Sequence, residues 1–85
     1  MTQGKEMYFV YVLTSTSNSK RYCGLTSDLN RRLREHNSGK MRSTKAFKPW
    51  KMAYYEELDS RKVARQREKF FKTGEGRELL DQILG

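Results

Sequence analysis

The chain has 85 residues, and a chain of this length buries only about 60–65% of its unfolded surface, which limits it to one small hydrophobic core. Its single cysteine, Cys23, excludes an internal disulfide, and no Cys/His cluster offers a zinc site. Eighteen Lys and Arg against ten Asp and Glu give a net charge of +8, which attracts nucleic acid or anionic lipid.

Nothing in the sequence favours attachment to a membrane. The apolar run Met7–Leu13 is too short to span a bilayer, and no basic amphipathic helix or lipidation motif is present. The lone thiol fits a reducing, cytoplasmic setting. We therefore expect one domain over residues 1–85, with a flexible N-terminus over residues 1–6. The alternative for the charge is a soluble protein whose cations only keep it dispersed.

The first half of the chain predicts a β-hairpin followed by a helix. Met7–Leu13 is apolar throughout and rich in β-branched and aromatic residues, as is typical of a strand buried on both faces. A polar turn over residues 14–20 leads to a second strand, Arg21–Leu25, which should return antiparallel. Thr26 or Ser27 can cap the next helix, which should end near residue 36 or 37, before Gly39.

The second half predicts a loop, a strand and two helices. Lys40–Lys48 is rich in cations and has no apolar period, so it indicates a loop. Trp50–Glu56 alternates as a third strand. Ser60 can cap a helix over Arg61–Lys72 that ends at residues 73–74, and a last helix should cover Arg77–Leu84. The predicted fold is α+β, a small sheet covered by helices.

Two short strings, Phe9-Val10-Tyr11 and Tyr22-Cys23-Gly24, are separated by ten residues. Because they lie on strands that should pair, the two tyrosine hydroxyls can reach one point beside the sheet. A phenol with a pKa of about 10 is a poor base, but a nearby cation lowers that pKa and lets it orient or deprotonate water. A purely structural role stays open, since tyrosine is common in strands. Gly24 indicates close approach of a ligand or a β-bulge.

Arg32 and His36 are four residues apart, so on a helix they point within about 40° of each other. Leu29 and Leu33 define the buried face of this helix, which puts the pair beside the core, where a cleft would lie. The alternative is an ordinary basic helix with solvated arginines and a partly packed imidazole.

Glu68 is the only acid in the stretch Arg61–Lys72, which holds six Lys or Arg residues. On a helix it falls near Ala64 and Phe71, toward the apolar side. An acid that leans inward needs a partner, and either a metal ion or an i,i+4 ion pair with Lys72 meets that need.

Together these residues supply the parts needed to hydrolyse a phosphodiester. The reaction needs an activated water, positive charge on the phosphate oxygens, and help for the leaving oxygen, often from a divalent cation. Mg²⁺ can be held by one carboxylate while substrate phosphate and waters complete its shell. Since the sequence offers no second carboxylate for a two-metal site, it favours one metal ion.

The order of these residues resembles that of the GIY-YIG nuclease superfamily, over roughly Tyr8 to Leu84. It is most similar to small stand-alone bacterial members and to the N-terminal nuclease part of excision-repair (DNA repair) enzymes. The resemblance implies a three-stranded antiparallel sheet flanked by about three helices, and Mg²⁺- or Mn²⁺-dependent cutting of DNA with a tyrosine-activated water. By position it assigns Tyr11 and Tyr22 to the motif tyrosines, Gly24 to the motif glycine, Arg32 to the phosphate-binding arginine, His36 to the assisting base or orienter, and Glu68 to the metal ligand.

The sequence departs from the family pattern at two motif positions, where Phe9 replaces a glycine and Cys23 replaces an isoleucine. A late asparagine that some members place in the site has no counterpart. Because no DNA-targeting domain is attached, we expect target choice to come from a protein partner or from basic residues. The cations expected to contact nucleic acid are Arg31, Lys40, Arg42, Lys45 and Lys48.

The sequence therefore predicts a DNA endonuclease. The alternative hypothesis is a catalytically silent module that binds DNA or structured RNA, with Trp50, Tyr54 or Tyr55 stacked on bases.

Overall fold

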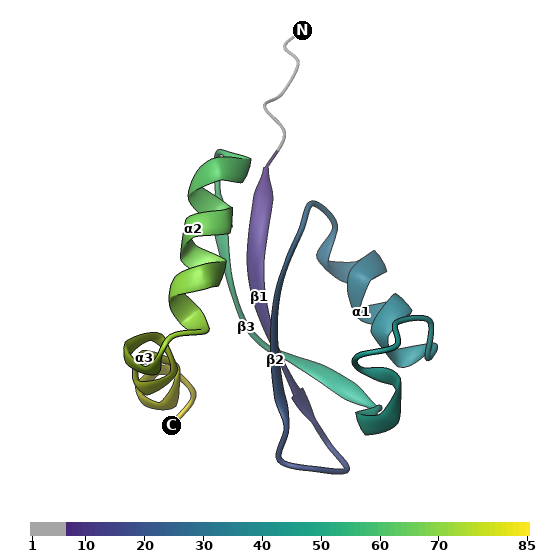
Figure 1. Cartoon of the computed structure of the whole chain (residues 1–85). Helices are drawn as coiled ribbons and strands as arrows, with labels where there is room; N and C mark the ends of the chain where they lie inside the picture. Colours follow the sequence, from purple (N-terminus) through teal and green to yellow (C-terminus); the bar gives the residue numbers. More distant parts are fainter. Residues whose placement is uncertain (1–6) are drawn as a thin grey trace, which may run out of the picture.

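A computed structural model describes residues 7–85, so the N-terminus expected over residues 1–6 lies outside the described part. Three strands, β1 (Tyr8–Ser15), β2 (Arg21–Thr26) and β3 (Trp50–Leu58), form one antiparallel sheet in the order β2-β1-β3 (Figure 1). The predicted α+β fold is confirmed, and β2 is left as an edge strand.

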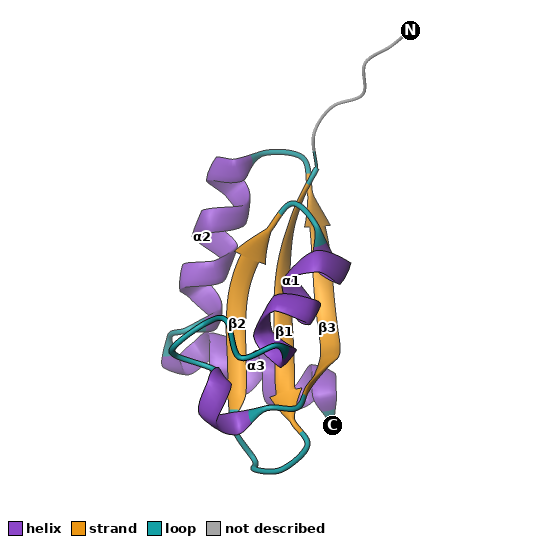
Figure 2. Ribbon diagram, turned by 90° about the vertical axis from the view of Figure 1, so that its right-hand side faces the viewer, coloured by secondary structure: helices purple, strands orange, loops and turns teal. Residues whose placement is uncertain are grey.

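Helices cover both faces of this sheet (Figure 2). Helix α1 (Leu29–Asn37) crosses one face, and α2 (Arg61–Phe71) and α3 (Gly74–Leu84) cover the other. A short 3₁₀ turn, Lys45–Phe47, interrupts the long basic loop. No helix within residues 7–85 has the length and apolar character needed to cross a bilayer.

Strand β1 lies between the two cores, as its continuous apolar run predicts. Successive side chains of a strand point to opposite faces. Val10 and Val12 accordingly pack toward α2 and α3, whereas Tyr11 and Leu13 pack toward α1 with Trp50. The four β1 residues are each at most 2% exposed. This burial on both sides fixes the position of the Tyr11 ring.

The cap of α1 is Asp28, whereas the sequence indicated Thr26 or Ser27. The Asp28 carboxylate accepts a hydrogen bond from the Arg31 backbone N–H at 3.0 Å. Thr26 instead ends β2, and its hydroxyl accepts from the Asp28 backbone N–H at 3.1 Å. The strand therefore extends one residue further than expected, and the helix begins directly after a tight polar turn.

Helix α3 begins at Gly74, three residues before the predicted Arg77. Thr73 both follows α2 and caps α3, since its hydroxyl accepts from the Gly76 backbone N–H at 3.1 Å. A side chain at position 76 would overlap the Phe70 carbonyl group, so glycine lets the two helices meet closely. After this joint, α3 is linked to β2 by an ion pair between Asp81 and Arg21.

Helix α2 is held against β3 by a charged network. Arg67 donates hydrogen bonds to both carboxylate oxygens of Glu56 at 2.7 and 2.9 Å, and the Tyr54 hydroxyl donates to the same carboxylate at 2.7 Å. The Arg67 guanidinium also lies 4.5 Å from the centre of the Phe71 ring. These hydrogen bonds lower the pKa of Glu56 below its usual range. The network fixes the helix that carries Glu68.

Candidate active site

A pocket of about 360 Å³ opens beside the edge strand β2. It draws on four elements, with Tyr11 from β1, Tyr22 and Gly24 from β2, Arg32 from α1 and Glu68 from α2. Three further arginines line it: Arg31, Arg61 and Arg65. The structure thus brings most of the residues singled out in the sequence into one place.

The strand register explains how the two tyrosines meet. Tyr11 lies opposite Gly24, and Tyr22 lies opposite Leu13, so both phenols are on the same face of the hairpin. Their ring centres are 6.2 Å apart. The Tyr22 hydroxyl makes no hydrogen bond within residues 7–85, which leaves it available to a ligand in the pocket.

Gly24 provides space for the Tyr11 ring. A Cβ atom at position 24 would lie 2.5 Å from the Tyr11 hydroxyl oxygen and 2.7 Å from its ring carbon Cζ. The pairing of β1 with β2 is unbroken, and the one bulge lies between β1 and β3. The β-bulge interpretation of this glycine is therefore wrong, because the space over Gly24 is filled by a neighbouring phenol.

We expect Gly24→Ala to lower the free energy of unfolding by about 1–3 kcal/mol, because a methyl group would force a buried ring out of position. Gly74→Ala is the matched control, since nothing lies within 4 Å of a Cβ there. Urea unfolding of both variants measures the difference. Equal stabilities would show that the Tyr11 ring does not depend on the glycine.

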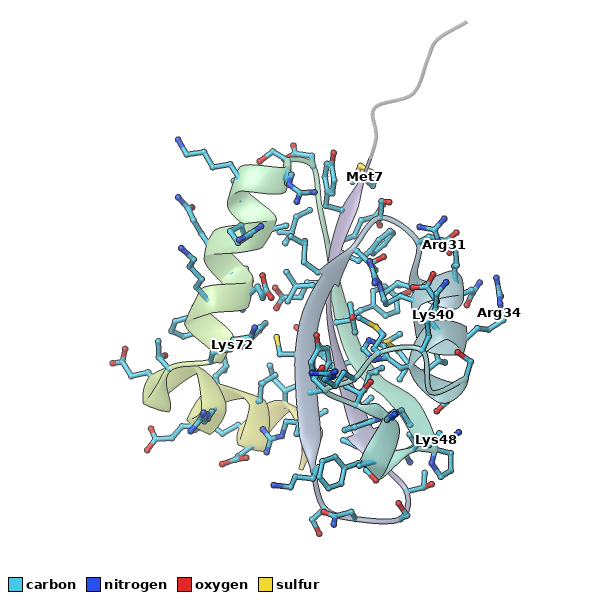
Figure 3. All side chains as sticks on the ribbon, turned by 45° about the vertical axis from the view of Figure 1, so that its right-hand side comes forward. Met7, Arg31, Arg34, Lys40, Lys48 and Lys72 are labelled. Carbon is cyan, nitrogen blue, oxygen red and sulfur yellow. The ribbon has the colours of Figure 1, made fainter. Side chains whose placement is uncertain are left out.

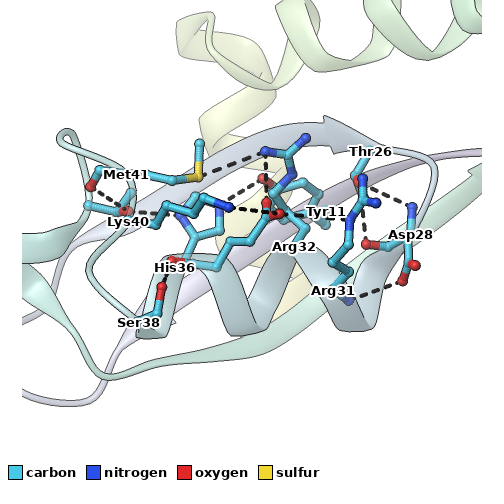
Figure 4. A network of polar contacts seen from close by, with 11 residues as sticks. Tyr11, Thr26, Asp28, Arg31, Arg32, His36, Ser38, Lys40 and Met41 are labelled. Carbon is cyan, nitrogen blue, oxygen red and sulfur yellow. Dashed lines mark hydrogen bonds and ion pairs between the residues drawn. The ribbon is translucent and has the colours of Figure 1, made fainter.

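Tyr11 begins a buried chain of hydrogen bonds (Figure 4). Its hydroxyl lies 2.9 Å from His36 Nε2, and His36 Nδ1 lies 2.8 Å from the Thr44 hydroxyl. The Thr44 hydroxyl is also 3.5 Å from the Met41 carbonyl oxygen. Tyr11, His36 and Thr44 are at most 2% exposed. His36 therefore lies beneath Tyr11 and does not line the pocket, although its sequence position suggested the edge of a cleft.

Burial keeps both members of the Tyr11–His36 pair neutral near pH 7. Desolvation, with the nearby phenol of Tyr22, raises the pKa of Tyr11 well above its usual range. Desolvation and the charge of Arg32 lower the pKa of His36. If Thr44 donates to Met41, it accepts from His36 Nδ1–H, and Nε2 is then free to accept the Tyr11 proton. The chain of hydrogen bonds thus has a consistent direction, from phenol to imidazole to hydroxyl to carbonyl.

Thr44 was missed in the sequence because it lies in a loop without an apolar period. A buried imidazole needs hydrogen-bond partners for both ring nitrogens. The Thr44 hydroxyl, eight residues after His36, was the feature of the sequence that could have indicated the second partner. No buried side-chain polar atom in the described chain lacks a hydrogen-bond partner.

Arg32 lines the pocket with its side chain 29% exposed. Its guanidinium lies 3.3 Å from Glu35, and Arg31 lies 3.7 Å from the same carboxylate. One acid thus faces two arginines on α1, so the helix presents net positive charge to the pocket. Arg34, one of the labelled residues of Figure 3, is exposed and does not line this pocket.

Glu68 is 16% exposed and faces the same pocket from the other side. One of its oxygens lies 3.1 Å from Lys72 Nζ, and the other is 3.9 Å from Arg65. The i,i+4 ion pair foreseen as an alternative is thus present. Within residues 7–85 there is no group of three acids, histidines or cysteines that could hold a metal ion. The residues present fit a hard cation held by one carboxylate, with water and phosphate as its other ligands.

The other predicted contact residues lie outside this pocket. Lys40, Arg42, Lys45 and Lys48 are all exposed on the loop after α1, and Lys40 is 4.0 Å from Glu35. Lys40 and Lys48 are labelled in Figure 3. Trp50 is only 5% exposed, and its indole N–H donates to the Thr44 carbonyl at 2.9 Å. The suggestion that Trp50 stacks on bases is therefore wrong.

The two motif departures have structural reasons. The ring of Phe9 packs edge-on against Tyr55 at 5.9 Å, so the larger side chain is accommodated on the surface of β3. Cys23 packs against the core under α2 and α3, where an apolar residue is needed. Neither replacement affects the residues of the buried hydrogen-bond series, Tyr11, His36 and Thr44.

The small antiparallel sheet brings paired tyrosines, an arginine and a glutamate to one pocket, and the family match that follows gives this arrangement a nuclease-type fold. The model of the GIY-YIG catalytic domain matches residues 7–79. The chain belongs to this family.

Its relatives are small bacterial proteins known as UPF0213 proteins. One from Bacillus pumilus is 40% identical over 70 residues, which cover 81% of this chain and 70% of the relative. UPF0213 protein YazA of Bacillus subtilis is 36% identical over 66 residues, covering 76% of this chain and 66% of the relative. The solution structure of a UPF0213 protein from Bacillus halodurans matches with a TM-score of 0.56 and 27% identity, covering 93% of this chain and 86% of that one.

Proposed function

We propose that this protein is a divalent-cation-dependent endonuclease that hydrolyses phosphodiester bonds in DNA. The observation that carries the proposal is the composition of one pocket. Two phenols, a guanidinium and a carboxylate reach it from four different elements, and three more arginines surround them. Such a set suits a phosphate whose charge increases in the transition state.

Arg32 is proposed to bind a non-bridging oxygen of the phosphate that is cut. A planar guanidinium can donate two parallel hydrogen bonds to a phosphate, which fixes orientation as well as charge. Arg31 stands next to it on the same helix and lines the same pocket. Both are only loosely paired with Glu35, at 3.3 and 3.7 Å, so a phosphate can take that acid's place.

Tyr11 is proposed to pass a proton from the attacking water to His36. A neutral phenol is a poor base, but it can accept a proton from water while it donates its own proton to His36 Nε2, 2.9 Å away. The lowered pKa of His36 keeps the imidazole neutral and able to accept. Thr44 holds the ring in the orientation that this transfer needs. Tyr22, whose hydroxyl makes no hydrogen bond within residues 7–85, is proposed to orient the water.

Glu68 is proposed to hold the divalent cation, Mg²⁺ or Mn²⁺. Such a cation, when bound, adds positive charge beside the phosphate and the departing oxygen. The carboxylate faces the pocket opposite α1 and is little exposed, so an exchange of its cationic partners for a metal ion is feasible there.

DNA is the proposed substrate because the pocket and its surroundings are cationic and the family is of the nuclease type. Target choice is proposed to come from the shape of the DNA or from a protein partner.

The test is nicking of supercoiled plasmid, branched DNA and single-stranded DNA with Mg²⁺, with Mn²⁺ and with a chelator. We expect cutting of at least one of these substrates with a divalent cation and none with the chelator. If the protein binds all three substrates and cuts none, it is a binding module with a nuclease-type fold.

A further inference from the structure

A second cavity, of about 520 Å³, lies on the other side of Tyr22. It is bounded by the start of β2, the end of α2 and the first turns of α3, and its lining includes Lys72 and Arg77. Lys72 is labelled in Figure 3, on the α2 side of β2, away from Arg31 on α1. None of the site residues proposed above other than Tyr22 lines this cavity.

The two cavities are neighbours along the edge of β2. Tyr22 lines both of them. Glu68 lines the first, and its ion-pair partner Lys72, 3.1 Å away, lines the second. A chain that occupies the first cavity can therefore continue into the second past the ring of Tyr22.

The charges of the second cavity suit a phosphate ester. Arg77 is exposed, and its guanidinium makes no ion pair or side-chain hydrogen bond within the described residues 7–85. The Lys72 side chain is 53% exposed, and within residues 7–85 its ammonium group forms one ion pair, with Glu68. Arg21 and Asp81 also line this cavity and form an ion pair at 2.5 Å, so their two charges offset each other. Arg77 is thus available to an anion at this place, and the Lys72 ammonium group, although paired with Glu68, has further N–H groups that can donate to one.

The walls of the cavity favour a nucleic-acid strand over a free anion. Phe71 and Leu80, each 1% exposed, line its inner side, whereas the two cations lie at its rim. A sugar–phosphate backbone carries both a deoxyribose, whose C–H groups can contact apolar side chains, and a charged phosphate. Burial raises the pKa of the Cys23 thiol, which lines the same cavity, to about 11, and this disfavours its thiolate form.

From these observations we propose that the second cavity is a phosphate-binding subsite, in which Lys72 and Arg77 hold the backbone of the DNA strand that continues from the first pocket. The inference rests on the proposed function for its substrate. It also specifies the direction of the bound DNA strand, which must extend past Tyr22 toward α3 to bind with full affinity.

The experiment compares two double variants, each of which removes two positive charges. Lys72→Gln/Arg77→Gln removes the proposed subsite, and Lys62→Gln/Lys69→Gln removes two exposed lysines of α2 that line neither cavity. Binding of fluorescent single-stranded DNA is measured by anisotropy over a salt series, without divalent cations. Arg77→Gln is added as a single variant because it leaves the Glu68–Lys72 ion pair intact.

We expect the subsite variant to bind a long oligonucleotide about 10-fold more weakly than the control variant. Its slope of log K against log salt should fall by about 1.4, since each lost phosphate contact on a single strand contributes about 0.7. A dinucleotide, which fills only the first pocket, should bind Arg77→Gln as tightly as the wild type, because this variant leaves the Glu68–Lys72 ion pair intact. Arg77→Gln should show about half of the loss in slope.

Equal affinities of the two double variants for the long oligonucleotide would overturn the subsite, whether or not the wild type cuts DNA. A selective loss of affinity together with no cleavage by the wild type would support the subsite and reject the nuclease. Thermal unfolding of each variant verifies that all of them are folded.

Discussion

Replacing Glu68 with glutamine is expected to slow DNA cleavage by about 10²–10³-fold. The amide keeps the size of the side chain and removes the charge that would hold the divalent cation. Since Glu68 is paired with Lys72 and lies near Arg65, its neutralisation also leaves two cations free. Binding of DNA without a divalent cation should therefore be unchanged or slightly tighter, although cleavage falls.

Single-turnover cleavage at several concentrations of Mg²⁺ or Mn²⁺ measures this effect. Glu78→Gln is the control, because Glu78 is exposed on α3 and lines neither cavity. The control should cut at the wild-type rate. If the two variants cut equally well, Glu68 is only a partner of its neighbouring cations and the cation is held elsewhere.

The second large effect is expected for Tyr11→Phe, which should slow cleavage by about 10²–10³-fold by removing the proton relay. The phenyl ring keeps the packing over Gly24. The buried His36 Nε2 loses its partner, so the free energy of unfolding should also fall by about 1–2 kcal/mol. Tyr55→Phe is the control, since Tyr55 is 52% exposed on the edge strand β3.

The pH dependence of cleavage separates the relay from a purely structural role. His36 accepts a proton only when neutral, and burial lowers its pKa. The wild-type rate should thus be steady near pH 7 and should fall only when the pH drops below the ordinary range of histidine. A phenylalanine variant that retains the wild-type rate and pH profile would exclude Tyr11 as a relay.

The sequence was sufficient to predict most of the fold because its strongest signals are local. The apolar run of β1 reports burial on both faces, and Ser60 caps α2 as expected. Boundaries that depend on competition between polar residues were predicted less well. Thr26 and Asp28 can each cap α1, and the choice depends on whether Thr26 stays in the sheet.

The arrangement around Tyr11 depends on contacts between residues far apart in the sequence. The sequence could therefore indicate which residues take part, but not which of them contact one another. The space over Gly24 is a property of strand register. The burial of His36 requires the basic loop to fold back, which brings Thr44 to its second nitrogen. Helical or strand periodicity predicts neither the contact of Tyr11 with Gly24 nor that of Thr44 with His36. His36 accordingly lies deeper than its helix position suggested.

The roles proposed for the pocket share one claim, that a phosphodiester is cut between α1 and α2 at the edge of β2. The most direct test is single-turnover cleavage by the wild type, Arg32→Ala and Arg34→Ala in a buffer with Mg²⁺ or Mn²⁺. Both arginines are on α1, but only Arg32 lines the pocket. We expect the wild type and Arg34→Ala to cut at similar rates and Arg32→Ala to be at least about 10²-fold slower. No cleavage by the wild type, or equal rates for the two variants, would contradict the account.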